Sequence, residues 1–162
     1  MHREISELAE TVVKTAKSQN LTVGTAESCT GGWIGQALTT VPGSSSVFMG
    51  GLTTYSNDVK MNVLGIPSDI ISFYGAVSEP VASAMAMQSR DLLGVDIAVS
   101  VTGIAGPGGG SEEKPVGLVY FGLATGGNVK THIKNFGNIG RENVRGQSVL
   151  FALELIQSAS AD

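Results

Sequence analysis

The chain has 162 residues, a net charge of −4 and 42% hydrophobic, 15% charged and 6% aromatic residues. This length fits one domain over residues 1–162, and the apolar content supplies a mainly aliphatic core, which excludes a largely disordered chain. The acidic balance argues against nucleic-acid binding, and no apolar run suits a signal peptide or a membrane span, so we expect a cytoplasmic protein without nucleic-acid or membrane partners.

The counts of cysteine and glycine narrow the chemistry further. Cys29 is the only cysteine, which excludes an intrachain disulfide and a cysteine-based structural zinc site. We expect no metal and no cofactor. The 22 glycines gather at the joints between periodic segments, where a close backbone approach or a positive φ is needed. Such a distribution is typical of loops that carry a site.

The first third of the chain alternates helical and extended segments. Apolar residues at helical spacing predict an amphipathic helix over residues 3–18. A short extended run over 21–26 leads through Glu27–Gly32 into a helix that starts at Trp33. The order is therefore strand, tight turn and helix.

The middle of the chain continues this alternation. The pattern predicts a strand over 47–55, a short helix over 57–64 that ends at Gly65, and another helical piece from Pro67. Ser78, Glu79 and Pro80 indicate the start of a helix that runs to about Leu93.

The last third predicts a strand over 95–101, a long loop over 102–115, and strands over 116–125 and 129–136 joined as a hairpin. A closing helix covers residues 141–158. The alternation of helices and strands, with one hairpin, indicates an α/β or α+β sandwich whose sheet is part parallel and part antiparallel.

Ser28 lies where an apolar strand gives way to a helix. Its hydroxyl and the first-turn amides of that helix would face one point, which suits an oxyanion or a phosphate. The alternative for Ser28 or Thr30 is a simple helix cap.

A serine nucleophile needs a base, and the two histidines, His2 and His132, stand in unsuitable places for a triad. Lys60 and Tyr55 follow the strand with Gly50 and Gly51. A buried lysine with a lowered pKa can deprotonate a serine, whereas an ordinary Lys60 would be solvated and an ordinary Tyr55 would pack its ring.

Cys29 is the rival nucleophile, because a thiol at a helix N-terminus can ionise more readily. Adjacent side chains diverge, so only Ser28 or Cys29 can point into one pocket, and burial in the core is the alternative for Cys29.

The glycine-rich loop after Thr102 could hold a phosphate or nucleoside through backbone amides, although it matches no dinucleotide fingerprint. Arg141 and Arg145 lie four apart on one face of the last helix and could bind an anion. Solvation, or pairing with Glu142, is the alternative for these arginines.

Taken together, Ala26–Gly32, Gly50-Gly51 with Tyr55 and Lys60, Thr102–Pro107 and Lys114–Gly117 resemble the CinA C-terminal domain family, the nicotinamide mononucleotide deamidases. The resemblance runs in order through nearly the whole chain and corresponds to the form without a preceding molybdopterin-binding-type domain.

The resemblance implies a three-layer α/β/α sandwich, commonly assembled as a homo-oligomer. It implies an amidohydrolase that converts nicotinamide mononucleotide and water to nicotinate mononucleotide and ammonia in pyridine-nucleotide salvage. Ser28 would be the nucleophile, with Lys60 and Tyr55 activating it and handling the leaving group. Substrate would meet backbone or side-chain groups of six residues: Thr30, Gly31, Gly32, Thr102, Gly103 and Arg141.

Two other functions stay open at this point. A non-catalytic nucleotide- or partner-binding module, as the older competence or damage-inducible label suggests, would bind ligand without releasing ammonia. A hydrolase for another small amide or ester would turn over without preferring the mononucleotide.

Overall fold

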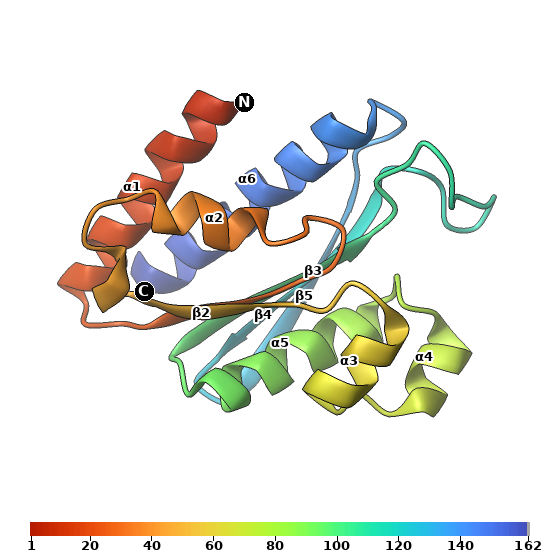
Figure 1. Cartoon of the computed structure of the whole chain (residues 1–162), viewed down its shortest axis with the longest axis horizontal. Helices are drawn as coiled ribbons and strands as arrows, with labels where there is room; N and C mark the ends of the chain where they lie inside the picture. The colour runs from red at the N-terminus through yellow and green to blue at the C-terminus, as the bar shows by residue number, and fades with distance from the viewer. Residues whose placement is uncertain (162) are drawn as a thin grey trace.

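The computed structural model describes residues 1–161, which form a central sheet between two layers of helices (Figure 1). In these residues the sheet has five strands in the order β2-β1-β3-β4-β5. Their bounds are β1 (Val23–Glu27), β2 (Phe48–Thr53), β3 (Ile97–Gly103), β4 (Leu118–Thr125) and β5 (Asn128–Asn135). The strands β2, β1 and β3 are parallel, and β4 and β5 are antiparallel to their neighbours, which confirms the mixed sheet.

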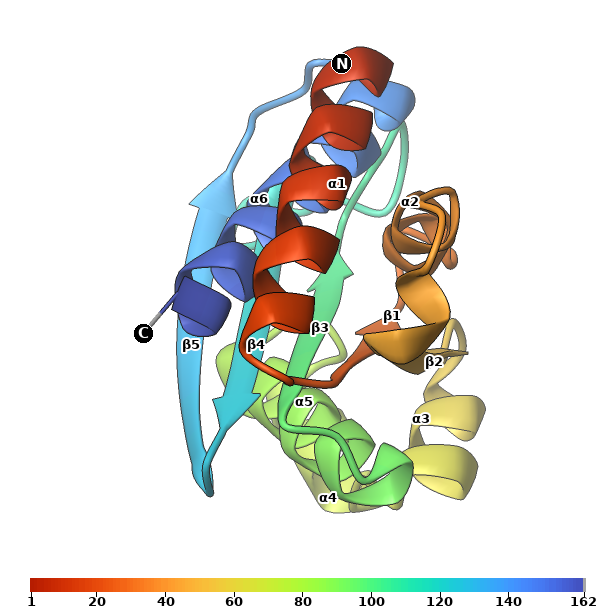
Figure 2. The ribbon, with the colours of Figure 1, turned by 90° about the vertical axis from the view of Figure 1, so that its left-hand side faces the viewer.

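The helices are divided between the two faces of the sheet. One face carries α1 (His2–Ser18), α2 (Trp33–Thr39) and α6 (Arg141–Ala161), and the other carries α3 (Asn57–Leu64), α4 (Ser68–Tyr74) and α5 (Glu79–Leu93) (Figures 1 and 2). A short 3-10 helix, η1 (Ser44–Ser46), precedes β2. The expected three-layer α/β/α sandwich is confirmed.

The burial of a strand follows from its position in the sheet. Every residue of β1 is buried, and β3 is buried up to its last residue, because both strands are covered by helices on two faces. The edge strand β5 is largely exposed. At the hairpin, Gly126 and Gly127 have φ values of 51° and 86°, which a two-residue turn of the I′ type requires.

The strand order creates a topological switch point between β1 and β3, at the carboxyl edge of the sheet. From β1 the chain crosses one face of the sheet through α2 to reach β2. From β2 it crosses the other face through α3, α4 and α5 to reach β3, on the opposite side of β1. The connections that leave the carboxyl ends of β1 and β3 therefore diverge, which is where open α/β sheets bind ligands. Ser28 directly follows β1 at this edge.

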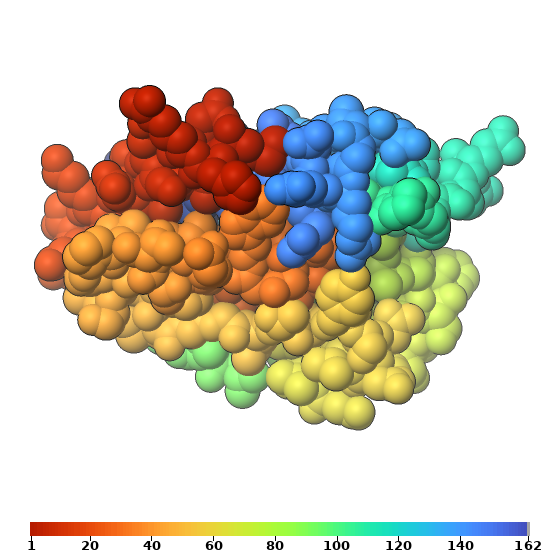
Figure 3. All heavy atoms as spheres, turned by 45° about the horizontal axis from the view of Figure 1, so that its top comes forward, coloured from red at the N-terminus to blue at the C-terminus, as the bar shows by residue number. Residues whose placement is uncertain are grey.

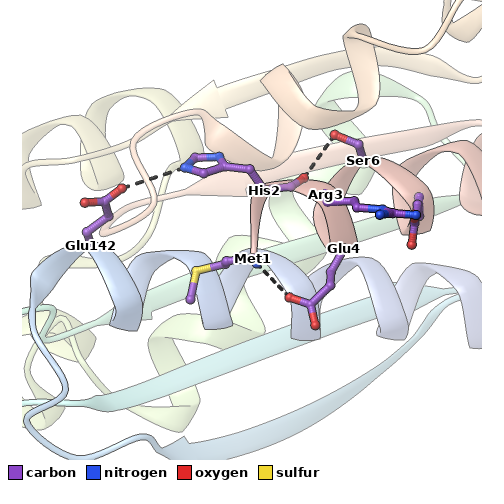
Figure 4. A network of polar contacts seen from close by, with 7 residues as sticks. Met1, His2, Arg3, Glu4, Ser6 and Glu142 are labelled. Atoms are coloured by element: carbon purple, nitrogen blue, oxygen red, sulfur yellow. Dashed lines mark hydrogen bonds and ion pairs between the residues drawn. The ribbon is translucent and has the colours of Figure 1, made fainter.

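The first turn of α1 lies beside the first turn of α6 (Figure 4). The amino group of Met1 lies 2.9 Å from the Glu4 carboxylate, and His2 Nε2 lies 3.7 Å from the Glu142 carboxylate. The contact between His2 and Glu142 joins the two helices next to Arg141, which begins α6. Among residues 1–161, no helix is long and apolar enough to cross a membrane.

Candidate active site

Ser28 and Lys60, 32 positions apart in the sequence, meet at the carboxyl end of β1. Lys60 Nζ donates a hydrogen bond of 3.0 Å to Ser28 Oγ. The lysine comes from α3, where it is 1% exposed, and Ser28 is 9% exposed. The structure thus brings together the two residues on which the expected nucleophilic chemistry depends.

Two main-chain carbonyls complete the surroundings of the Lys60 amine. Nζ also donates to the carbonyl oxygens of Thr54, at 2.7 Å, and Tyr55, at 3.2 Å. Burial lowers the pKa of Lys60 from 10.5 to about 8. A neutral amine can keep both carbonyl contacts with its two hydrogens and turn its lone pair toward Ser28 Oγ. The site therefore has the geometry of a serine with a lysine base.

The segment from Ser28 to Gly32, here called the serine turn, links β1 to α2. Gly31 N–H donates to the Ser28 carbonyl, which closes a four-residue turn. The N–H groups of Cys29 and Thr30, in the middle of this turn, donate to no carbonyl and to no other side chain of the described residues. Cys29 is 6% exposed and Thr30 is 0% exposed, so these two unpaired amides lie beneath the surface of the protein.

The buried carboxylate of Glu27 accepts hydrogen bonds from the end of the serine turn and from the first turn of α2. Glu27 is 1% exposed and accepts hydrogen bonds from Thr30 Oγ1 (2.6 Å) and from the N–H groups of Gly32 (3.1 Å), Ile34 (3.0 Å) and Gly35 (2.9 Å). The start of α2 is thus occupied by the protein's own anion. The first-turn amides that the sequence assigned to an oxyanion or phosphate do not face a ligand, and neither does the Gly32 amide.

Arg145 holds the opposite side of the serine turn. Its Nε donates to the Cys29 carbonyl at 3.1 Å, and one terminal nitrogen donates to the Thr30 carbonyl at 3.0 Å. Its guanidinium also lies 5.5 Å from the centre of the Trp33 ring. This arginine supports the turn and does not pair with Glu142.

The rival nucleophile, Cys29, is buried in the main hydrophobic core. Burial, with a smaller contribution from the Glu27 charge, raises the pKa of its thiol to about 12. A thiol in this environment stays protonated at neutral pH, so the structure favours Ser28 over Cys29.

Tyr55 and Arg141 form a separate group at the rim of the site. One terminal nitrogen of Arg141 donates to Tyr55 Oη at 3.0 Å, and the other donates to the Gly106 carbonyl at 2.9 Å. Tyr55 is 58% exposed, and its main-chain oxygen, not its phenol, contacts Lys60. Figure 3 shows the start of α6, in blue, meeting the yellow segment that contains β2 and α3 on this face.

Thr102 and Gly103 end β3, the strand that pairs with β1. Thr102 Oγ1 donates to the Ala76 carbonyl at 2.9 Å. A Cβ at Gly103 would lie 2.7 Å from a Val119 methyl, so this glycine is required by the close approach of β4. The hydroxyls of Thr102 and Thr30 are thus both engaged within the protein, and their contact with substrate stays a prediction.

Sequence reasoning gave Glu27 no role, and it expected Arg145 to bind an anion rather than the carbonyls of the serine turn. Glu27 is a single charged residue directly after an apolar strand, and this position is the signal for a buried carboxylate that needs donors. Arg145 lies one helical turn after Arg141, but its approach to the serine turn depends on how α6 packs against α2, which no local pattern gives.

The protein is an α/β/α sandwich with a buried serine and lysine in contact at the carboxyl edge of its parallel strands. The family profile described as the CinA C-terminal domain matches residues 5–160. The chain belongs to this family.

Solved structures agree with this assignment. The competence/damage inducible protein CihA from Agrobacterium tumefaciens has a TM-score of 0.95 and 44% identity, covering 98% of this chain and 96% of that one. A CinA superfamily protein from Klebsiella pneumoniae has a TM-score of 0.92 and 32% identity, covering 97% and 98% of the two chains.

Curated relatives are of two lengths. The chain is 49% identical over 152 residues to a CinA-like protein of Synechococcus, covering 93% of this chain but 36% of that protein. It is 44% identical over 154 residues to the nicotinamide-nucleotide amidohydrolase PncC of Escherichia coli K12, covering 94% of this chain and 93% of that protein. The chain thus spans about a third of the first kind and nearly all of the second.

Proposed function

We propose that this protein is an amidohydrolase that converts nicotinamide mononucleotide and water to nicotinate mononucleotide and ammonia, with Ser28 as nucleophile. The observation that carries the proposal is the buried hydrogen bond between Lys60 Nζ and Ser28 Oγ. The choice of substrate is supported by the name of the E. coli relative, nicotinamide-nucleotide amidohydrolase, which matches over nearly its full length.

In the first half of the reaction, neutral Lys60 takes the Ser28 hydroxyl proton while Oγ attacks the carboxamide carbon. The negative charge that develops on the amide oxygen is held by the N–H groups of Cys29 and Thr30. The Lys60 ammonium then returns its proton to the amide nitrogen. The C–N bond breaks, ammonia leaves, and the nicotinoyl group remains bound to Ser28 as an ester.

The second half of the reaction repeats these proton transfers with water. Lys60 takes a proton from the water, whose oxygen attacks the ester carbon through a second oxyanion. The bond to Ser28 Oγ breaks, Lys60 reprotonates the serine, and nicotinate mononucleotide is released. The balance requires one water and no metal or other cofactor.

Recognition of the nucleotide is assigned to the rim of the site. Arg141 uses two of its five N–H donors on Tyr55 and Gly106, which leaves three for an anionic group. Tyr55 orients this guanidinium through its phenol. Arg141 is therefore the candidate for the phosphate, whereas Ser28 and Lys60 act on the carboxamide.

The proposal includes the setting in which the protein works. A substrate of pyridine-nucleotide salvage is an intracellular metabolite, which fits the expected cytoplasmic location. The single domain over residues 1–162 and assembly as a homo-oligomer are further parts of the proposal.

The test is ammonia release from nicotinamide mononucleotide by purified protein without added metal, with nicotinamide riboside as the comparison that lacks phosphate. We expect turnover of the mononucleotide and little of the riboside. Ser28→Ala should lower kcat by at least about 1,000-fold while it retains product binding, measured by calorimetry. Cys29→Ala should have a mild effect.

Other results would assign the site differently. Normal turnover by Ser28→Ala would overturn the serine mechanism. Nucleotide binding without ammonia release by the folded wild type would indicate a binding module. Equal turnover of other small amides or esters would indicate a hydrolase with a different substrate.

A further inference from the structure

The buried carboxylate of Glu27 is directly adjacent to the proposed nucleophile, yet it takes no part in the reaction described above. A carboxylate has about four acceptor positions. The Thr30 hydroxyl and the amides of Gly32, Ile34 and Gly35 supply four donors at 2.6–3.1 Å. A fifth donor, Thr25 Oγ1, is more distant at 3.4 Å.

The four donors come from positions three to eight residues after Glu27, so one rigid group fixes the whole path of the chain from β1 into α2. Ser28 N–H is also held, through a 3.0 Å bond to the Val101 carbonyl on β3. Glu27 and Arg145 bind the serine turn from opposite sides, Glu27 through N–H and O–H donors and Arg145 through carbonyls. Between these anchors lie the unpaired amides of Cys29 and Thr30, to which the proposed mechanism assigns the oxyanion.

We propose that Glu27 is a positioning residue, whose buried carboxylate sets the angle of Ser28 Oγ toward Lys60 and the direction of the Cys29 and Thr30 amides. This inference rests on the proposed role of Ser28 as nucleophile. By occupying the start of α2, the same carboxylate excludes a substrate anion from that helix end and leaves Arg141 as the anion site.

The test compares Glu27→Gln with wild type and with Thr25→Val as the matched control. Glutamine keeps the shape of the side chain, but its amide group cannot accept from the donors that now face one carboxylate oxygen. Thr25→Val alters only the long contact with the same carboxylate. Circular dichroism and thermal unfolding establish that each variant is folded at the assay temperature.

Two readouts distinguish positioning from a merely structural role. The first is the division between kcat and KM for nicotinamide mononucleotide. The second is the rate at which a small fluorophosphonate labels Ser28, a reaction in which Oγ forms a bond to phosphorus, fluoride leaves and the hydroxyl proton is released. This labelling needs no nucleotide and reports the reactivity of Ser28 directly.

For Glu27→Gln we expect kcat to fall about 100-fold, because small displacements of reacting groups have effects of this size. KM should stay within about threefold of the wild-type value, and labelling should slow by a factor similar to that for kcat. Thr25→Val should stay within about threefold in all three quantities. Unchanged kcat and labelling in Glu27→Gln, or a rise in KM alone, would overturn the inference.

If Glu27→Gln does not fold, Thr30→Val decides, because it removes the shortest bond to the carboxylate and leaves the charge in place. Slower labelling of Ser28 in that variant supports positioning, and wild-type labelling overturns it. The proposed substrate is tested separately. If wild type releases no ammonia but is labelled at Ser28, and Glu27→Gln slows this labelling, the substrate is wrong and the inference on Glu27 stands. A wild type that does not label at Ser28 overturns both.

Discussion

At the scale of single residues, the site depends on the burial of the Lys60 amine, which is energetically unfavourable. Lys60 is 1% exposed, and its amine contacts only a hydroxyl and two carbonyl oxygens among the described residues. An ammonium ion in such a place loses hydration that three neutral acceptors replace only in part. Its lowered pKa follows from this, and with it the capacity to act as a base near neutral pH.

The pH dependence of the reaction should report this lysine. Since the base form of Lys60 is neutral and its pKa is about 8, kcat should rise about tenfold per pH unit below that value and level off above it. The measurement is the initial rate of ammonia release between about pH 6 and 10, a range that extends to both sides of the transition. A profile that is flat over this range would argue against Lys60 as the base.

Arg141 should act on binding more than on chemistry. We expect Arg141→Ala to raise KM for the mononucleotide about tenfold, because one charge-assisted contact to phosphate is lost, and to leave the riboside nearly unaffected. Arg141→Lys is the matched control, since it keeps the charge and loses the fork that reaches Tyr55 and Gly106. Equal losses on both substrates would move the phosphate site elsewhere.

At the scale of elements, α5 lies unusually close to the sheet at Gly122 of β4. A Cβ at this position would meet the Ala82 carbonyl and lie 2.7 Å from Ser100 Oγ. That hydroxyl donates to Ala82 O at 2.6 Å and accepts from Gly122 N–H at 3.1 Å. One serine thus joins α5, β3 and β4 at the glycine.

Gly122→Ala should therefore lower the free energy of unfolding by about 1–3 kcal/mol, because the added methyl forces α5 away from β4. Urea denaturation followed by circular dichroism measures this change. Gly108→Ala is the control: it has open space around its Cα and no positive φ, so a change below about 0.5 kcal/mol is expected. Equal stability of both variants would contradict the close packing.

Local pattern was sufficient to predict most elements but not all of their ends. The helical period of α1 and the Gly126-Gly127 turn are visible in short windows of sequence, and both are confirmed. The strand β3 continues through Gly103, beyond the expected end at Val101, because β4 pairs with it up to Val119. No local sequence pattern predicted the 3-10 helix at Ser44–Ser46.

At the scale of the whole molecule, the site is assembled from four connections at one edge of the sheet. Ser28 follows β1, Lys60 follows β2, Thr102 ends β3 and Arg141 begins α6. Their residue types were recognisable in the sequence, and so was their order. The contact of Ser28 with Lys60, 3.0 Å in the structure, was expected only through the family resemblance, because local pattern contains neither the switch in strand order nor the orientation of α3.

Assembly is a property that belongs to this scale. We expect sedimentation velocity to give a mass that is a multiple of the 16.6 kDa chain, in line with the homo-oligomer that the family resemblance implies. Phe73 of α4, which is 82% exposed, is an apolar side chain that a second copy would cover. A sole species at the mass of one chain would contradict this expectation.

The burial of Lys60 also gives the protein an unusual pattern of amine reactivity. A neutral amine is the form that acylating reagents attack, and at mildly alkaline pH a larger fraction of Lys60 is neutral than of a solvated lysine. Its enclosure removes that advantage, since a reagent must displace the serine turn or α3 to reach Nζ. By its ionisation Lys60 is well suited to accept an acyl group, but its buried position protects it from modification.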